Sequence, residues 1–164
     1  MKSHGSLPPQ TDEFTRSLLS AMLALKEGDF SVRLPPDLVG VNGKIADAFN
    51  DTAKVCERRA LEIARVTQAV GKQGKLKQRM SVAGVRGGWA EEVFAINNLI
   101  DDLVWPTSEV TRAVGAVAKG DLSQAVPLEV EGRPLEGEFL RSAKLVNTMI
   151  DQLSVFTSEV TPRR

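Results

Sequence analysis

The sequence predicts an all-α protein whose helices pair as coiled coils. A short glycine motif recurs at a spacing of 46 residues, at Gly28, Gly74 and Gly120, which indicates an internal repeat. Between these motifs, apolar residues recur at alternating spacings of three and four, the period of coiled-coil helices. Aromatic residues make up only 5% of the chain, which is thin for a ligand-binding sandwich or barrel. Together these features favour helices stacked in repeated units.

The composition excludes several classes of function. Charge is balanced, with 21 basic and 21 acidic residues among 164, so overall charge points to neither a nucleic-acid partner nor a membrane surface. One cysteine and one histidine allow no internal disulfide and are too few for a usual zinc site. No apolar run approaches the roughly 20 residues of a membrane span. We therefore expect a cytoplasmic chain without metal, cofactor, nucleic-acid partner or membrane span.

Each repeat reads as a helix, a connector that begins with glycine, and a second helix. The second helices share an apolar-asparagine pair, seen in Phe49-Asn50, Ile96-Asn97 and Val146-Asn147. Glycine ends a helix well because it adopts the left-handed conformation. The expected first helices are 13–26, 60–73 and 107–118, the connectors are 28–41, 74–87 and 120–137, and the second helices are 43–59, 89–106 and 138–160.

The apolar seam predicts a parallel homodimer. The seam runs from each second helix into the next first helix without a glycine break. Pro106 falls at the expected start of a renewed helix, and proline is tolerated in the first turn of a helix. Helices this short are marginal alone, whereas two chains supply four helices and close a core. The expected dimer core comprises Leu18, Phe49, Cys56, Ile63, Ile96, Leu103, Val110, Val114, Val146, Ile150 and Leu153.

The connectors are expected to anchor in the groove between their two helices. A large apolar residue follows each glycine motif: Phe30, Leu76 or Leu122. A second anchor should follow further along, although the sequence leaves two choices in each connector. These choices are Val32 or Leu34, Met80 or Val82, and Val126 or Leu128.

Charge is uneven around the second repeat. Residues 54–79 hold eight basic and two acidic side chains, whereas residues 91–109 hold five acidic and no basic ones. A basic stretch can indicate nucleic-acid binding. The simpler interpretation is that basic and acidic helices face each other across flanking positions of one bundle, where charges guide pairing.

A known family shares these features. The strings Val-Thr-Gln-Ala-Val-Gly-Lys-Gln-Gly-Lys-Leu at 66–76, Val-Ala-Lys-Gly-Asp-Leu-Ser-Gln at 117–124, Val-Asn-Thr-Met-Ile-Asp-Gln-Leu at 146–153 and Ser-Glu-Val-Thr at 158–161 resemble the HAMP domain. The alternation of Gly-Lys-Leu with Gly-Asp-Leu units is similar to the HAMP arrays of group III hybrid sensor histidine kinases and their bacterial relatives. The resemblance implies that Glu138 is the glutamate which often begins the second helix.

The resemblance divides the chain into three modules and implies a function. The modules are 13–59, 60–106 and 107–161, between a disordered leader at 1–12 and a tail at 162–164. Each would be a parallel four-helix coiled coil formed by a homodimer, and the modules would stack into a rod. The abrupt end, where a new helix begins, suggests a piece of a longer protein.

The implied function is non-catalytic relay of a conformational signal to a downstream kinase or other output domain of the same chain. Phosphate-binding glycine loops are missing, and the single histidine, His4, lies in the polar leader. The kinase core is therefore not expected here. Two alternatives stay open: a structural coiled-coil scaffold without switching, and a helical bundle that binds a small ligand or a partner protein.

Overall fold

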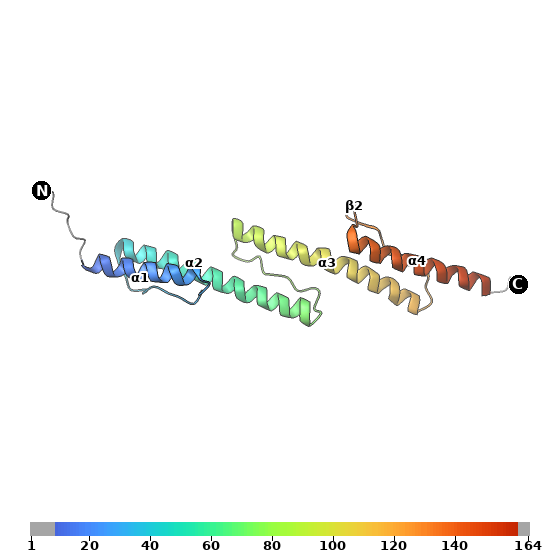
Figure 1. The fold of residues 1–164 in the computed structure, drawn as a ribbon, viewed down its shortest axis with the longest axis horizontal. Helices are drawn as coiled ribbons and strands as arrows, with labels where there is room; N and C mark the ends of the chain where they lie inside the picture. The colour runs from blue at the N-terminus through green and yellow to red at the C-terminus, as the bar shows by residue number, and fades with distance from the viewer. Residues whose placement is uncertain (1–8, 161–164) are drawn as a thin grey trace. The chain divides into compact units, whose positions relative to one another are not determined.

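A computed structural model describes residues 9–160 of the chain and is mostly helical (Figure 1). The elements in chain order are α1 (Pro9–Lys26), α2 (Gly40–Val66), the π-helix η1 (Thr67–Lys72), α3 (Gly88–Ala118), the strands β1 (Glu129–Val130) and β2 (Arg133–Pro134), and α4 (Gly137–Val160). The chain divides into two compact units, Met1–Met80 and Ser81–Arg164, and each is described by itself.

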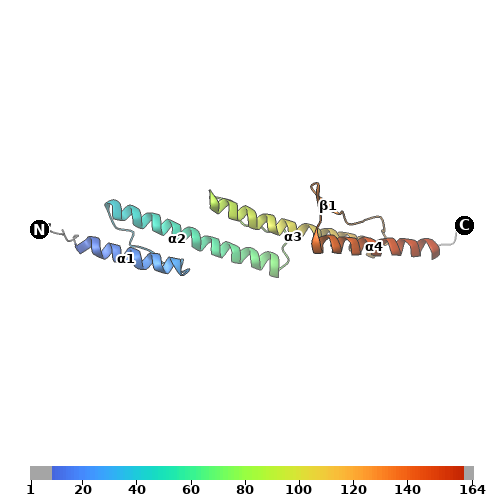
Figure 2. The ribbon, with the colours of Figure 1, turned by 45° about the horizontal axis from the view of Figure 1, so that its top comes forward.

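In the first unit, α1 packs beside the first part of α2, and a connector returns between them. Figures 1 and 2 both show the two helices running in the same direction, with the connector lying along them. Ala21 of α1, Leu34 of the connector and Ala46 of α2 form a buried cluster. Small alanines on the two helices allow a close approach, and the connector supplies the larger apolar side chain.

The helix α2 passes through Ala60 without interruption and continues into η1. The expected helices 43–59 and 60–73 are therefore one element, as the unbroken apolar series indicates. The α1 helix begins at Pro9, earlier than expected, so residues 9–12 of the expected leader are helical. The rest of that leader, residues 1–8, and the expected tail at 162–164 lie outside the described residues.

In the second unit, α4 runs beside the last part of α3 and in the same direction (Figure 1). The buried cluster between them takes Ala113 from α3, Ala143 and Ile150 from α4, and Val126 and Leu135 from the connector. The arrangement resembles that of the first unit, because alanines of both helices share one buried cluster with larger side chains of the connector. In this unit α4 adds the larger Ile150 as well.

Pro106 lies in the interior of α3, where it is buried. Its placement in the first turn of a renewed helix is wrong, because α3 is a single helix from Gly88 to Ala118. A proline there removes the amide that would bond to the carbonyl four residues earlier, at Asp102. Nearby, the hydroxyl of Thr107 donates to the Leu103 carbonyl at 2.9 Å. The helix continues because the rest of its ladder and its packing hold it.

The third connector carries a small antiparallel hairpin, which an all-helical prediction does not include. Val130 pairs with Arg133 across a two-residue turn. Glu131 and Gly132 both have positive φ, at 51° and 75°, as the tightest hairpin turns require. Arg133 then forms an ion pair of 2.8 Å with Asp102 of α3.

Candidate functional site: the anchored connectors

Each connector begins at a glycine with positive φ, as the sequence predicts. The angles are 91° at Gly28, 66° at Gly74 and 83° at Gly120. A side chain is disfavoured there, because the left-handed conformation strains residues with a Cβ. These glycines therefore end the first helices and set the direction in which each connector leaves.

An aspartate then fixes the first turn of two connectors. The amide and hydroxyl of Ser31 both donate to the Asp29 carboxylate, at 3.0 and 2.5 Å. Ser123 donates to Asp121 in the same way, at 2.9 and 2.6 Å. These hydrogen bonds hold the pKa of each aspartate below its ordinary value. The ionised carboxylates thus stabilise the turns that follow Gly28 and Gly120.

The structure decides which apolar residue is the second anchor of each connector. Leu34, Met80 and Val126 are 4%, 3% and 2% exposed. The alternatives Val82 and Leu128 are 50% and 41% exposed, and Val32 is half-buried. The first anchors Phe30, Leu76 and Leu122 are half-buried as well. The deeper anchor lies four residues after the shallow one in every connector.

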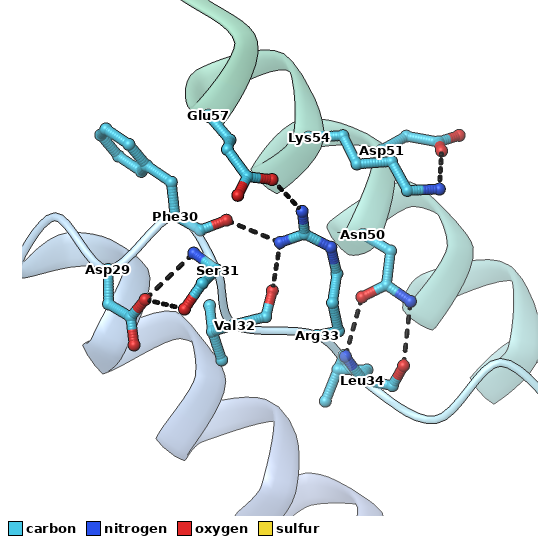
Figure 3. Close-up of polar contacts among 10 residues, drawn as sticks. All are labelled: Asp29, Phe30, Ser31, Val32, Arg33, Leu34, Asn50, Asp51, Lys54 and Glu57. Carbon is cyan, nitrogen blue, oxygen red and sulfur yellow. Dashed lines mark hydrogen bonds and ion pairs between the residues drawn. The ribbon is translucent and has the colours of Figure 1, made fainter. Parts of the chain in front are cut away.

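An asparagine of the second helix holds the deep anchor by its backbone. The Leu34 amide donates to Asn50 Oδ1 at 2.7 Å, and Asn50 Nδ2 donates to the Leu34 carbonyl at 2.9 Å (Figure 3). Asn50 is the buried polar side chain of the described chain, at 9% exposure. We call this pair of bonds an asparagine bridge. It satisfies both backbone groups of a residue that the apolar anchor draws into the core.

The second unit contains the same asparagine bridge. The Val126 amide donates to Asn147 Oδ1 at 2.7 Å, and Asn147 Nδ2 donates to the Val126 carbonyl at 3.0 Å. Both asparagines come from the repeated apolar-asparagine pair of the second helices. The repeated pair predicted that the two asparagines occupy equivalent positions. It did not predict that their side chains bond to the backbone of the connector.

Arginine side chains hold the connectors from outside. In the first unit, Arg33 donates to the carbonyls of Phe30 and Val32 at 2.6 and 2.7 Å and to Glu57 of α2 at 2.6 Å (Figure 3). Arg79 repeats the local part of this pattern, with bonds to the carbonyls of Leu76 and Gln78. Charged donors suit these carbonyls because one guanidinium can reach several of them.

A second type of arginine contact joins a first helix to its own connector. Arg112 of α3 donates to Glu109, to the Gln124 side chain and to the Ala125 carbonyl, each at 3.0 Å. Arg65 repeats this set with Glu62, Gln78 and the Arg79 carbonyl. The bond to Glu62 raises the pKa of Arg65 further above its ordinary value. The repeated Glu-x-x-Arg spacing carried this signal, which sequence reasoning did not use.

The predicted dimer-core residues fall into two groups. Leu18, Phe49, Val110 and Val146 pack against the buried clusters of their own units, and Ile150 is a member of one, at 4% exposure. Cys56 and Ile96 are half-buried. The rest stay exposed in the single chain, at 37% for Ile63, 47% for Leu103, 45% for Val114 and 38% for Leu153. The predicted seam thus includes residues that pack against the buried cluster of their own unit and residues that stay exposed.

Glu138 lies in the first turn of α4, where an acidic residue suits the positive end of the helix dipole. Its side chain is 83% exposed and forms an ion pair of 3.4 Å with Arg141 of the same helix. Among the described residues, the hydrogen bonds and the ion pair of Glu138 go to Arg141 and not to a connector.

The hydrogen bonds described above hold backbone groups of the connectors in place. Within residues 9–160, no three or more histidine, cysteine, aspartate or glutamate side chains gather where they could hold a metal ion. Over the same range, no helix has the length and apolar character needed to cross a membrane. The groups with shifted pKa, Asp29, Arg65 and Asp121, are local partners in turns and helix contacts. What these contacts determine is where the first and the third connector lie against the two helices of their own unit.

The comparisons with known proteins agree with this architecture. The family model described as HAMP domain matches residues 84–154, so a HAMP domain is present over α3, the third connector and most of α4. The chain is also 29% identical over 104 residues to the methyl-accepting chemotaxis protein McpB of Pseudomonas aeruginosa. That match covers 63% of this chain but only 15% of the chemotaxis protein. No solved structure matches the chain. The HAMP resemblance is thus supported, and one relative is a methyl-accepting chemotaxis protein.

Proposed function

We propose that this chain is a signal-relay region of a sensor protein, in which HAMP modules pair as parallel homodimers and pass a conformational change to an output domain. The observation that carries this proposal is a set of predicted dimer-core residues that stay exposed within the region matched by the HAMP family model. In α3 and α4, Leu103, Val114 and Leu153 remain 47%, 45% and 38% exposed, although the same helices supply a buried cluster. A second copy with the same seam would cover them and complete a four-helix core.

The module boundaries also belong to the proposal. Three modules at 13–59, 60–106 and 107–161, stacked in series, follow from the 46-residue spacing of the glycine motif. The second of these takes residues from both compact units. The anchored connectors support a module of this kind at each end of the described chain, because asparagine bridges occur at Asn50 and Asn147.

Two outputs are compatible with such a relay. The alternation of Gly-Lys-Leu and Gly-Asp-Leu motifs favours the cytoplasmic, two-component histidine kinase context that the sequence resembles. The chemotaxis protein found by comparison favours a receptor whose output is a chemotaxis signal. In either case the output domain would lie in the same parent chain, and this region would contribute no catalysis.

The dimer is tested first by mass in solution. Light scattering behind a sizing column should give about twice the chain mass of 17.8 kDa. Substituting Leu103→Glu should reduce that mass to one chain, because a charge in an apolar seam is strongly disfavoured. Leu145→Glu is the matched control, since Leu145 of α4 is 62% exposed and lies outside the predicted seam. A wild-type monomer, or equal effects of the two substitutions, would contradict the proposal and favour a ligand- or partner-binding bundle.

The parallel direction is tested by cross-linking. Cys56 is the single cysteine of the chain, so a covalent dimer formed by mild oxidation must join two copies of it. Parallel pairing in register brings the two Cys56 side chains to the same level, whereas antiparallel pairing along the whole chain separates them beyond the reach of a disulfide. Cys56→Ser supplies the blank.

A relay is distinguished from a scaffold by the phase of the helix. In the parent protein, seven residues inserted after Thr107 keep the heptad phase, whereas three residues break it. Relay through α3 should therefore survive the first insertion and lose stimulus-dependent output with the second. A scaffold without switching should give the same output with both.

A further inference from the structure

The helices that lead into the first and third connectors, α1 and α3, end in the same way. We call these two the flanking helix ends. Beyond α1, Gly28 donates to the Leu25 carbonyl at 3.0 Å and Asp29 to the Ala24 carbonyl at 3.0 Å. Beyond α3, Gly120 donates to Val117 at 2.9 Å and Asp121 to Ala116 at 2.9 Å. Both are Schellman ends, in which the residue after glycine bonds back five positions. The residue before each glycine bonds back by four positions or fewer, Glu27 to the Leu23 carbonyl and Lys119 to the Ala116 carbonyl.

The helix that leads into the middle connector, α2 continued by η1, ends differently. Its last residues form η1, and Gln73 donates to the Gln68 carbonyl, five positions back, at 3.0 Å. Lys75, which follows Gly74, donates to the Ala69 carbonyl, six positions back, at 2.9 Å. The counterparts of Lys75 are Asp29 and Asp121, which bond five positions back. The middle helix thus holds one more residue in its last turn than the flanking helices do.

The sequence explains why this end is looser. At the 46-residue spacing, Gly71 occupies the place of Leu25 and Val117. Its φ is not in the left-handed range and a Cβ would meet nothing within 4 Å, so the fold does not require glycine there. Glycine instead weakens the last turn, because it keeps more backbone freedom than other residues.

The turn after Gly74 lacks the chemistry that locks its counterparts. Lys75 stands where Asp29 and Asp121 accept hydrogen bonds, and Lys77 stands where Ser31 and Ser123 donate them. Two lysines cannot form that turn, because neither side chain accepts a hydrogen bond. The middle connector is therefore free of the contact that fixes the start of the other two.

We propose that Thr67–Lys72 is a switch segment that exchanges between the π-helical turn and an α-helical turn ending at Gly74. In the second state, Lys75 would bond to the Val70 carbonyl, five positions back as Asp29 and Asp121 do. Gln73 would bond to the Ala69 carbonyl, four positions back as Glu27 does. Short π-helical insertions concentrate at functional positions. The exchange moves the shallow anchor Leu76 by one residue relative to the buried Val66 and Ala69. A change of one residue at a helix end is a discrete displacement that packed neighbours can amplify.

The test uses NMR relaxation dispersion on the deuterated full chain. Millisecond exchange should affect the amides of residues 67–76 and be absent from 24–31 and 116–123. A flank-like variant gives this helix end the residues of the flanking helix ends, through Gly71→Leu, Lys75→Asp and Lys77→Ser. It should reduce the exchange contribution to the relaxation rates of these amides at least several-fold. A crystal structure of that variant should show the amide of position 75 bonded to the Val70 carbonyl.

A reciprocal variant and a mild one complete the test. Val117→Gly with Asp121→Lys and Ser123→Lys should introduce exchange at the end of α3. Gly71→Ala, which meets no steric obstacle, should reduce exchange at 67–76 even if the flank-like variant does not fold. Flat dispersion at 67–76 in the wild type, equal exchange at all three helix ends, or a flank-like variant that keeps the Ala69 bond would overturn the proposal. These measurements need no output domain, so they can fail independently of the relay.

Discussion

Asn147 on α4 holds the backbone of Val126 on the third connector by two hydrogen bonds, at 2.7 and 3.0 Å. Asn50 holds Leu34 in the same way in the first unit. One side chain thereby satisfies both polar groups of a residue whose own side chain is buried. The connector is fixed in register as well as in position, because an amide can match the backbone of only one residue at a time.

Removing an asparagine bridge should destabilise the unit that contains it. Asn50→Ala leaves the amide and carbonyl of Leu34 without their partner in a buried place, which should lower the free energy of unfolding by about 2–4 kcal/mol. Asn147→Ala should cost less, because Asn147 is only half-buried. Urea denaturation followed by circular dichroism measures both. Asn98→Ala, at an exposed position of α3, should change stability little, and an equal loss there would contradict the role of the bridge.

Gly43 should resist substitution although it lies in a helix. An alanine Cβ at this position would overlap the carbonyl group of Leu38, whose carbon it would approach to 2.9 Å. Because that neighbour is backbone, Gly43→Ala should cost about 1–3 kcal/mol of stability. The matched control is Gly115→Ala in α3, where a Cβ meets nothing within 4 Å. Better helix propensity should make the control more stable by about 0.5–1 kcal/mol; a stabilised Gly43→Ala would show that the Leu38 contact is not tight.

The aspartate turns should make stability depend on acidity. Hydrogen bonds from Ser31 and Ser123 lower the pKa of Asp29 and Asp121 from the ordinary 3.8. Their contribution is therefore complete above pH 3.8 and is lost as the pH falls through the lowered values. Urea midpoints measured at pH 7 and below pH 3.8 should differ less in Asp29→Asn with Asp121→Asn than in the wild type. An unchanged difference would assign the acid sensitivity to other carboxylates.

Arg112 should control the local motion of the third connector more than global stability. Its partners Glu109, Gln124 and the Ala125 carbonyl are exposed or half-buried, so Arg112→Gln should cost about 0–1 kcal/mol. Hydrogen exchange of amides at 121–126 should nevertheless become faster, because the helix no longer holds the connector. Arg141→Gln is the control, since the polar partner of Arg141 among the described residues is Glu138 of its own helix, at 3.4 Å. Equal protection in both variants would argue against the arginine contact.

Much of the fold was predictable because it follows from a pattern repeated along the chain. The glycine spacing located the helix ends at Gly28, Gly74 and Gly120, and the uninterrupted seam predicted helices that continue through Ala60. The deep anchors were narrowed to two choices, since apolar character alone does not distinguish Leu128 from Val126. Burial separates them, and burial depends on the path of the connector.

The rest depended on geometry that residue types do not reveal. The repeated asparagine was visible, but an asparagine in a helix has many possible partners. The π-helix arises from hydrogen-bond pairing among Gln68, Ala69, Gln73 and Lys75, and no residue type specifies such pairing. The hairpin at Glu131-Gly132 was absorbed into a longer connector, because two-residue strands leave no periodic signal. The histidine kinase context stays a prediction, while one relative of the chain is a methyl-accepting chemotaxis protein.

The hairpin has a practical consequence. Its two strands are held together at Val130 and Arg133, and the Leu135 amide bonds to the Leu128 carbonyl at 2.8 Å. The path between the deep anchor Val126 and the buried Leu135 is therefore closed at its base, whatever lies beyond the turn. Glu131 and Gly132 are exposed, and exposed loop tips with adjacent ends tolerate foreign sequence. An epitope or a fluorophore inserted between these two residues would report on the third connector in a living cell while leaving its attachment to α3 and α4 undisturbed.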